Sequence, residues 1–465
     1  MTGLAVIVLA AGQGKRMKTT LPKVLHPVAG VPMLRYVLDV AQRLQPDVII
    51  PVIGHGREQV REFLATQQHL PLTIVEQPEQ RGTGDALMVT KSAVDDRIRT
   101  ILILNGDVPL LTDETIKRLL SIQEHEQPSV TMLTASIPNP KGYGRVVRSE
   151  GNRVSKIVEE ADASPEERKI LEINAGTYVS TPSFLYSALG AIQPKNAQKE
   201  FYLTDTIEIA VAKGKGVAAL LLDDPAEAHG VNSRADLANV EGVMRWRIRE
   251  RIMAGGVTLV DPQSTYIDYA VEIGQDTVVY PHTALEGATT VGERCVIRSG
   301  VRIADSMLGC AVTILDSSVI SDSHIRDEVV VGPFAHLRTG SVLEQKSKVG
   351  NFVEMKKTVL GRGSKASHLS YLGDSRIGRD VNIGAGTVTC NYDGTQKHET
   401  IIEDGTFVGS NTALVAPVKI GSGALIAAGS TITNDVSPDE LGIARSKQVN
   451  KPAKGLKRKR KQVSS

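Results

Sequence analysis

Short apolar segments alternate with amphipathic segments over the first half of the chain. The apolar segments cover residues 4–9, 48–53, 72–75, 99–104 and 129–135, and the segments between them, 32–44, 56–66, 83–94 and 112–124, are predicted to be helical. Buried strands that alternate with helices are typical of a mostly parallel sheet covered on both faces. The first half is therefore predicted to be a Rossmann-like α/β domain.

The pattern changes over residues 140–225. The stretch 142–144 opens a predicted hairpin, and residues 182–190 and 202–213 are predicted to be helices. A longer helix follows over residues 233–256, which connects the two halves of the chain. We expect Asn232 or Ser233 to cap this helix, and the glycine pair 255–256 to end it.

The second half repeats an aliphatic residue at every sixth position. After single-residue slips the period resumes, and the series reads Ile273, Val279, Leu285, Val291, Ile297, Ile303, Leu308, Ile314, Ile320, Ile325, Val331, Leu337, Leu343, Val349, Met355, then Ile402, Val408, Leu414, Ile420, Ile426 and Ile432. A helix would repeat at 3.6 residues and a flat sheet at two, whereas six fits a coil of short strands with a turn after each. The prediction is a left-handed parallel β-helix of hexapeptide repeats. The register breaks between Thr389 and Ile402, which predicts an inserted loop.

These patterns divide the chain into four parts. We expect a first domain over 1–231, a helical linker over 232–255, the β-helix over 256–447 and a basic tail over 448–465. The tail, which contains "KPAKGLKRKRK", is predicted to be a solvated, flexible end, with nucleic-acid or membrane contact a minor alternative.

Composition excludes some classes of protein but does not indicate a function. A chain of 465 residues with 41% hydrophobic and 23% charged residues is typical of a soluble globular protein with two or three domains, and its net charge of +2 does not indicate nucleic-acid binding. Its three cysteines lack C-x-x-C spacing, so neither a zinc site nor a disulfide framework is expected. The chain has no apolar run of membrane-span length and no signal-peptide layout, so the cytoplasm is expected.

The glycine turn after the first apolar segment carries unusual charge. "LAAGQGKRMKTTLPKVL" (9–25) holds two glycines, four cations and no acid, but Met17 occupies the position where both the dinucleotide fingerprint and the P-loop need a glycine. A strand–loop–helix that binds an anion through backbone N–H groups, with Arg16 and Lys23 beside it, remains possible, and the alternative is a basic surface turn. Asp107 follows the apolar segment 99–104, at the edge of the sheet where ligands bind in open α/β folds. We expect it to be a Mg²⁺ ligand, and the alternative is a turn residue before Pro109.

Taken together, the motifs resemble a known enzyme family. The first half contains "LAAGQGKRM", "LPKVL", "RGTGDA", "NGDVPLL", "GYGRVV", "IVEE", "NAGTYV" and "HGVN", which are similar to the signature of sugar-phosphate nucleotidyltransferases. The second half contains "GPFAHLRTGS", "GNFVEMKK", "SHLSYLGD", "NIGAGTVTCNYDG" and "FVGSNTALVAPV". Over nearly its whole length the chain resembles the bifunctional N-acetylglucosamine-1-phosphate uridylyltransferases that are also glucosamine-1-phosphate acetyltransferases.

For the first half, the resemblance implies a nucleotide-sugar site with bound Mg²⁺. It assigns UTP or UDP-N-acetylglucosamine binding to Leu9, Ala10, Ala11, Gly12, Lys23, Gln77, Gly82, Thr83, Asn105, Gly106, Asp107, Gly144, Glu159, Asn174 and Asn232. Within this set, Asp107 and Asn232 are the expected metal ligands. The sugar phosphate attacks the α-phosphorus of UTP, so we expect Arg16 and Lys23 to stabilise charge, and no catalytic base is needed. Two positions depart from the family's pattern. Lys15 stands where many relatives have threonine, and Asn105 stands where some relatives have tyrosine.

For the second half, the resemblance implies acetyl transfer from acetyl-CoA. His368 matches the family's general base, which must take a proton from the sugar amine, and we add the hypothesis that Glu354 orients or polarises it. The implied glucosamine-1-phosphate contacts are Arg338, Lys356, Tyr371 and Asn382, and the implied acetyl-CoA contacts are Ala385, Asn391, Tyr392, Ser410, Ala428 and Arg445. The resemblance also implies a homotrimer formed through the β-helix.

Three other functions agree less well with the sequence. The first is a single-activity sugar-phosphate nucleotidyltransferase with a regulatory β-helix, which would not require His368 or the inserted loop. The second is a non-enzymatic assembly subunit, which would not require Lys23, Asp107 and Asn232. The third is a β-helix carbonic anhydrase, but His282, His324 and His336 share no strand phase.

Overall fold

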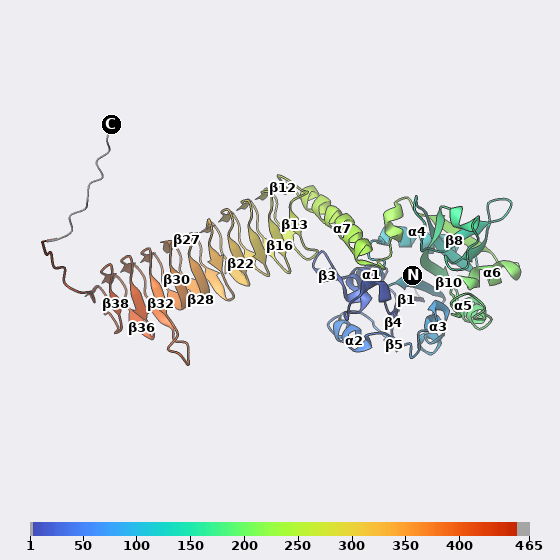
Figure 1. Cartoon of the computed structure of the whole chain (residues 1–465), viewed down its shortest axis with the longest axis horizontal. Coiled ribbons are helices and arrows are strands. Elements are labelled where there is room, and N and C mark those ends of the chain that lie inside the picture. Colours follow the sequence, from blue (N-terminus) through green and yellow to red (C-terminus); the bar gives the residue numbers. More distant parts are fainter. Residues whose placement is uncertain (1–2, 453–465) are drawn as a thin grey trace, which may run out of the picture. The chain divides into compact units, whose positions relative to one another are not determined.

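The computed structural model describes residues 3–452 (Figure 1). The chain forms two compact units, and the division between them falls in the sequence between Ile248 and Arg249. This point lies inside helix α7 (Arg234–Ala254). Each unit is described by itself below. The predicted tail falls, from residue 453 onward, outside the described residues.

Unit 1 is built on a mostly parallel sheet, as predicted. Within the described residues its strand order is β11-β7-β10-β6-β1-β4-β5, with β8 and β9 attached beside β10. β1 pairs in parallel with β4 and β6, whereas β10 runs antiparallel to β6 and β7. The strands are β1 Leu4–Ala10, β4 Val48–Ile53, β5 Val75–Glu76, β6 Thr100–Asn105, β7 Val130–Ser136, β8 Arg145–Arg148, β9 Val154–Val158, β10 Glu172–Ser180 and β11 Val217–Leu221, with a short separate pair β2 Pro27–Val28 and β3 Val31–Pro32.

Helices cover both faces of this sheet (Figure 1). They are α1 Met33–Arg43, α2 Arg57–Ala65, α3 Thr83–Met88, α4 Asp113–Glu126, α5 Pro182–Leu189 and α6 Asp205–Ala212. Val6 and Val8 of β1 belong to one hydrophobic cluster with residues of α1, α2 and α4, and Ala5 and Ile7 belong to a second cluster with residues of α3, α5 and α6. This alternation is the two-faced burial that the apolar segments indicate.

Two predicted elements of unit 1 are shorter or displaced. The helix expected over 83–94 ends at Met88, and a 3-10 turn follows at Lys91–Ala93. The Thr90 hydroxyl donates to the Leu87 carbonyl (2.6 Å), a local bond that competes with helix continuation. The strand expected over 72–75 is Val75–Glu76, and Leu72 forms an isolated parallel bridge with Ile49 through the Pro71 carbonyl and the Thr73 N–H.

Helix α7 begins and ends as the sequence indicates. The Ser233 hydroxyl accepts from the Asp236 backbone N–H (3.2 Å), while the Asp236 carboxylate accepts from the Asn232 and Ser233 backbone N–H groups (3.0 and 2.8 Å). This is a reciprocal capping box. At the other end Gly256 takes a positive φ of 89°, which a glycine adopts without strain.

Unit 2 is a parallel β-helix, which confirms the period of six. Its described residues form two long parallel sheets whose strands stack coil upon coil (Figure 1). The first is β12 Thr258–Leu259, β15 Val278–Val279, β18 Val296–Ile297, β21 Thr313–Ile314, β24 Val330–Val331, β27 Lys348–Asn351, β29 Lys365–His368, β31 Asn382–Ile383, β34 Phe407–Val408, β37 Leu425–Ile426 and β39 Leu441–Gly442.

The second sheet supplies the remaining sides of each coil. Its strands are β13 Tyr266–Ile267, β14 Glu272–Ile273, β16 Ala284–Glu286, β17 Thr290–Val291, β19 Arg302–Ala304, β20 Met307–Leu308, β22 Val319–Ser321, β23 Ser323–Ile325, β25 His336–Leu337, β26 Ser341–Leu343, β28 Glu354–Leu360, β30 Tyr371–Ile377, β32 Val388–Cys390, β33 Thr400–Ile402, β35 Ala413–Val415, β36 Val418–Ile420 and β38 Thr431–Ile432. The periodic aliphatics point inward; Val279, Leu285 and Ile303 are fully buried. The predicted loop leaves the coil between β32 and β33.

Two negative findings concern the described residues alone. No helix within residues 3–452 is both long enough and apolar enough to cross a membrane. Over the same range, no group of three or more His, Cys, Asp or Glu side chains is placed to hold a metal ion.

Candidate active sites

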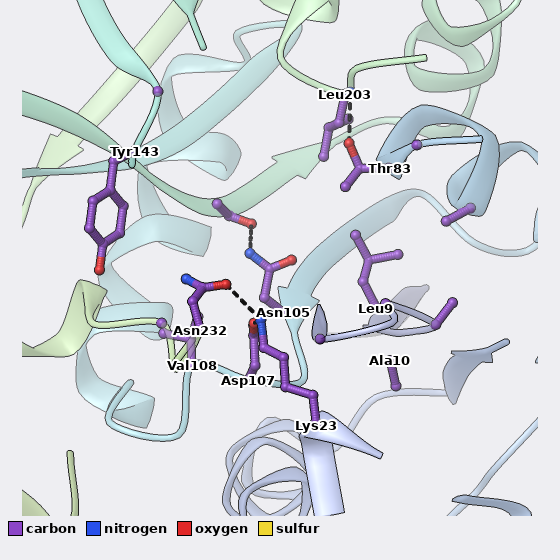
Figure 2. A pocket seen from close by; sticks show the side chains of 18 of the residues that line it. Leu9, Ala10, Lys23, Thr83, Asn105, Asp107, Val108, Tyr143, Leu203 and Asn232 are labelled. Carbon is purple, nitrogen blue, oxygen red and sulfur yellow. Dashed lines mark hydrogen bonds and ion pairs between the residues drawn. The ribbon is translucent and has the colours of Figure 1, made fainter. Parts of the chain in front are cut away.

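Unit 1 contains a pocket of about 710 Å³ at the carboxyl ends of β1 and β6 (Figure 2). Of the site residues predicted for this unit, the following line it: Leu9, Ala10, Ala11, Gly12, Arg16, Lys23, Gln77, Gly82, Thr83, Asn105, Asp107, Gly144, Glu159, Asn174 and Asn232. Gly106 is not among the lining residues. Its N–H donates to the Leu9 carbonyl (2.9 Å), so it supports the loop rather than facing the pocket.

The glycine turn reaches the pocket without forming a helix. A 3-10 turn, Lys15–Met17, follows Gly14, which has a positive φ of 60°. One of the two interpretations of the sequence was a strand–loop–helix at this point. In the described residues a single 3-10 turn takes the place of that helix. A Cβ on Gly14 would lie 2.8 Å from the Cβ of Lys23, so the glycine allows the lysine to pass close by.

Three polar side chains from distant parts of the chain meet at one point of the pocket. The Lys23 ammonium contacts the Asp107 carboxylate and donates to Asn232 Oδ1 (2.8 Å), as Figure 2 shows. The Val231 N–H donates to the Asp107 carbonyl (3.0 Å), which holds the loop before α7 against the loop after β6. Two hard oxygens therefore converge on a single cation.

This donor set fits Mg²⁺. Magnesium binds carboxylate and carbonyl oxygens, keeps several waters and needs few protein ligands. Asp107 and Asn232 supply one oxygen each, already turned toward the same positive charge. Lys23 is the group that a divalent ion would have to displace from these oxygens.

Gln77 and Thr83 fasten a second glycine turn of the pocket, at Gly82. Gln77 Nε2 donates to the Gly82 carbonyl (3.1 Å) and to Asp85 (2.8 Å), and Thr83 Oγ1 accepts from the Leu203 N–H (3.0 Å). Gly82 has a φ of 114°, and a Cβ there would lie 2.5 Å from the Phe201 carbonyl oxygen. Only glycine fits this turn.

The pocket lining also holds one acidic side chain, Glu159, and two amide side chains, Asn174 and Asn105. Burial raises the pKa of Glu159, and the Thr204 hydroxyl donates to its carboxylate (3.1 Å). Asn174 Oδ1 accepts from the Gly176 N–H (3.0 Å), and the Asn174 N–H donates to the Gly144 carbonyl (2.9 Å). Asn105 joins the same strand through the Gly176 carbonyl (3.3 Å).

Sequence reasoning missed Tyr143, Tyr178 and Thr204, which line the same pocket. Tyr143 is part of the "GYGRVV" motif, from which only Gly144 was predicted as a site residue. The Tyr178 hydroxyl is fully buried, and within residues 3–452 it makes no hydrogen bond of ordinary geometry, although the Asn174 side chain lies near enough to lower its pKa against the larger effect of burial. A buried hydroxyl that faces a pocket is a candidate ligand contact.

In unit 2, register brings together the residues assigned to the sugar phosphate. Arg338 forms an ion pair with Glu354 (2.6 Å), and Glu354 lies in register with Tyr371. Lys356 is the next outward residue on β28, and the Lys397 ammonium beside it lowers the pKa of Lys356, with Arg338 adding to the effect. Three cations thus converge beside one coil. Asn382 lies on the other sheet, in register with Lys365 and Phe407.

Lys397 is a residue that the sequence analysis did not select. It lies on the inserted loop, where it bridges to Tyr392 in a short antiparallel pair. Tyr392 is 61% exposed, and Asn391 donates to Asp374 of the coil (2.5 Å). A lysine three residues beyond a glycine in an inserted loop was a visible signal for an anion contact.

The partner of His368 is not the one we expected. Glu354 is engaged with Arg338, and His368 Nδ1 lies 2.6 Å from Asn351 Oδ1. The hypothesis that Glu354 orients His368 is therefore wrong for this structure. The reason is register, since His368 pairs with Asn351 across β27 and β29, while Glu354 lies beyond the next turn on β28.

Four of the six residues assigned to acetyl-CoA follow one corner of the β-helix, whereas Asn391 and Tyr392 begin the inserted loop. The Asn411 N–H donates to the Ala385 carbonyl (2.7 Å), the Gly429 N–H donates to the Ser410 carbonyl (2.8 Å), and Arg445 donates to the Ala428 carbonyl (2.6 Å). The same ladder continues toward His368, because the Gly386 N–H donates to the Leu369 carbonyl (2.8 Å). Ala385, Ser410, Ala428 and Arg445 therefore lie on successive coils in line with the histidine.

Comparison with known proteins gives matches over each unit and over the whole chain. Residues 6–174 match the model of the MobA-like NTP transferase domain, and residues 399–434 match that of the bacterial transferase hexapeptide repeats. A "Bifunctional protein GlmU" of Trichlorobacter lovleyi is 49% identical over 455 residues, which cover 98% of both chains. The proteins of the same name from Pelobacter propionicus (48% identity, 99% of this chain and all of the relative) and Shouchella clausii (49%, 97% and 98%) are similar to the same extent.

Proposed function

The chain belongs to the family of bifunctional GlmU proteins, and on that premise we propose how its two sites divide the work. It is a transferase with two activities. It acetylates glucosamine-1-phosphate with acetyl-CoA, and it transfers UMP from UTP to N-acetylglucosamine-1-phosphate, giving UDP-N-acetylglucosamine and pyrophosphate. The product is a precursor of bacterial envelope polymers, including peptidoglycan and lipopolysaccharide. A single-activity enzyme with a regulatory β-helix is not favoured, because the relatives cover both units.

We assign nucleotidyl transfer to the pocket of unit 1. The observation that carries this assignment is the convergence of Lys23, Asp107 and Asn232 beside the glycine turn. The sugar phosphate is already anionic, so the protein contributes positioning and charge stabilisation rather than a base. Lys23 and Arg16 neutralise phosphate charge, Gln77 and Thr83 hold the turn for the nucleoside, and Glu159 and Asn174 face the amino sugar.

Asp107 and Asn232 are the residues that would hold Mg²⁺. When bound, the ion supplies positive charge to the triphosphate and orients its oxygens. The protein's own contribution is to present two oxygens at one point, at the carboxyl edge of the sheet where the nucleotide phosphates are expected.

We assign acetyl transfer to the corner of the β-helix at His368. The Nε2 atom of His368 accepts the proton of the sugar amine, which makes the nitrogen a nucleophile toward the thioester. Arg338, Lys356 and Lys397 form a cationic group suited to the sugar phosphate, and Tyr371 lies in register with Glu354, the ion-pair partner of Arg338. The coil positions that follow His368 are proposed to hold coenzyme A.

We further propose a homotrimer that works in the cytoplasm. Exposed apolar side chains beside the histidine corner support an assembly through the β-helix: Phe334 and Phe352 stack with their ring centroids 5.5 Å apart, and Leu369 on the next coil is 60% exposed. The three cysteines of the chain, Cys295, Cys310 and Cys390, are free thiols, in keeping with a reducing compartment. Light scattering of the purified chain tests the trimer.

Two separate readouts test the two-site assignment. The protein is incubated with glucosamine-1-phosphate, acetyl-CoA, UTP and Mg²⁺, and free thiol and pyrophosphate are measured independently; the His368→Ala reaction is also supplied with N-acetylglucosamine-1-phosphate, and so is its wild-type control. His368→Ala should abolish thiol release while pyrophosphate release from supplied N-acetylglucosamine-1-phosphate continues. Asp107→Ala should abolish pyrophosphate release alone. If each substitution silenced both reactions, or neither, the assignment would be wrong.

A further inference from the structure

The side chain of Asn351 lies directly against the proposed general base. Its Oδ1 is 2.6 Å from His368 Nδ1. The two residues are partners in the parallel register of β27 and β29, and the Leu369 N–H donates to the Asn351 carbonyl (3.0 Å). The backbone of two neighbouring coils therefore holds this contact in place.

An amide oxygen imposes one form on the imidazole. Because Oδ1 can only accept a hydrogen bond, Nδ1 of neutral His368 must carry the proton, and the lone pair then resides on Nε2. The amide is also uncharged, so it orients the ring without the preference for imidazolium that a carboxylate would create. Both properties suit a base that has to be neutral before it can accept a proton.

We propose that Asn351 is a positioning residue for acetyl transfer, whose amide oxygen fixes His368 in the Nδ1–H form with Nε2 free to act as the base. This inference rests on the proposed acetyl-transfer function of unit 2. In the reaction, the amine nitrogen bonds to the thioester carbonyl carbon and the C–S bond breaks. The amine proton passes to Nε2 of His368 and from there to the leaving thiolate of coenzyme A.

Few other ionisable groups face this histidine from the adjoining strands. β27 contributes Lys348, which lies in register with Lys365 rather than with His368, and β31 (Asn382–Ile383) contributes none. On the following strand, Glu354 is paired with Arg338. The charge introduced by an Asn351→Asp substitution would therefore act on His368 at the distance of the present contact, 2.6 Å.

Asn351→Asp separates orientation from charge. The carboxylate keeps an acceptor for Nδ1–H but stabilises the imidazolium, so the acid limb of the kcat/KM profile for thiol release should move up by about one pH unit, with rates near wild type recovered at high pH. Asn351→Ala should lower kcat for thiol release by about 10- to 100-fold, with KM for acetyl-CoA unchanged. Asn434→Asp, in an exposed turn of the same β-helix, is the matched control for added charge.

Two outcomes would overturn the proposal. One is an Asn351→Asp profile that superimposes on the wild type or on the Asn434→Asp control. The other concerns the ¹⁵N chemical shifts of the wild-type histidines, in which the His368 signals are assigned by their loss in His368→Ala. At high pH these shifts should show a protonated Nδ1 and an unprotonated Nε2, and the reverse pattern would exclude the proposal. Because this measurement uses the unaltered protein, it holds even if a variant folds poorly. Loss of thiol release in His368→Ala tests the underlying function separately.

Discussion

Lys23 places a single ammonium group between the Asp107 carboxylate and the Asn232 amide oxygen. A divalent ion that uses these oxygens must compete with this ammonium, and the competition ends when a nucleotide phosphate draws the lysine away. Mg²⁺ and nucleotide should therefore favour each other's binding.

The first prediction follows from that competition. Lys23→Met should bind Mg²⁺ about tenfold more tightly in the absence of nucleotide, since the oxygens lose their internal cation, and should lose pyrophosphate release by at least about 100-fold. Titration calorimetry and the pyrophosphate assay measure the two effects. Lys18→Met, an exposed substitution in the same turn, is the control. Equal or weaker Mg²⁺ binding by Lys23→Met would contradict the competition.

Tyr178 provides a second prediction at this scale. Its buried hydroxyl faces the pocket without a well-formed hydrogen bond, so Tyr178→Phe should leave the free enzyme as stable as the wild type or more stable by about 1 kcal/mol. If the sugar phosphate supplies the missing partner, KM for N-acetylglucosamine-1-phosphate should rise by about tenfold while KM for UTP stays constant. Thermal unfolding and steady-state kinetics decide this, and a loss of stability with unchanged KM would assign the hydroxyl to the core instead.

At the scale of single elements, α6 starts with a carboxyl group in an unfavourable place. Burial raises the pKa of Asp205 to about 6, and Glu208 and Asp162 add to the rise. Since the pKa is higher in the folded chain than in the unfolded chain, ionisation costs stability. The cost is absent below about pH 4, where both states are protonated, and it is complete above about pH 6.

The third prediction is therefore a change in pH dependence. Asp205→Asn should remove the part of the fall in unfolding free energy that this group causes between about pH 4 and 6, and should stabilise unit 1 at pH 7. A two-unit shift corresponds to about 2.7 kcal/mol, which screening at this half-exposed position reduces to about 1 kcal/mol. Urea unfolding across this pH range measures it. Asp95→Asn is the control of opposite sign, because hydrogen bonds with Arg97 lower the pKa of Asp95.

At the scale of the whole molecule, each unit buries a core of its own. The two hydrophobic clusters that flank the nucleotide-binding sheet draw all their buried members from residues 4–228. The β-helix buries its aliphatics within its own coils. The residues proposed for each reaction likewise lie within one unit.

We accordingly expect the first unit to work alone. A chain ending at Gly256, after the last turn of α7, should release pyrophosphate from UTP and N-acetylglucosamine-1-phosphate at a rate within about tenfold of the intact protein, and should release no thiol from acetyl-CoA. The two assays above measure this, with Asp107→Ala in the same fragment as the inactive control. A folded fragment, shown by a cooperative unfolding transition, that releases no pyrophosphate would refute the independence of the units.

The local pattern of the sequence determined both architectures. Alternating apolar and helical segments predicted the parallel sheet, and the period of six predicted the β-helix, because each pattern records directly which side chains turn toward a core. Most residues that resemblance assigned to the first site do line one pocket, since they follow strands whose carboxyl ends meet at one edge of the sheet. The predicted helix over 83–94 was too long, because its end depends on individual hydrogen bonds such as that of the Thr90 hydroxyl.

What only the tertiary structure decided is which side chains act on one another. The Lys23 ammonium meets Asp107 and Asn232 because the sheet order folds three distant loops onto one edge. His368 meets Asn351 instead of Glu354 because the stacking register of the coils fixes the neighbour. Sequence pattern specifies whether a residue faces inward or outward, but its partners depend on strand order and register, which the packing of the whole unit sets.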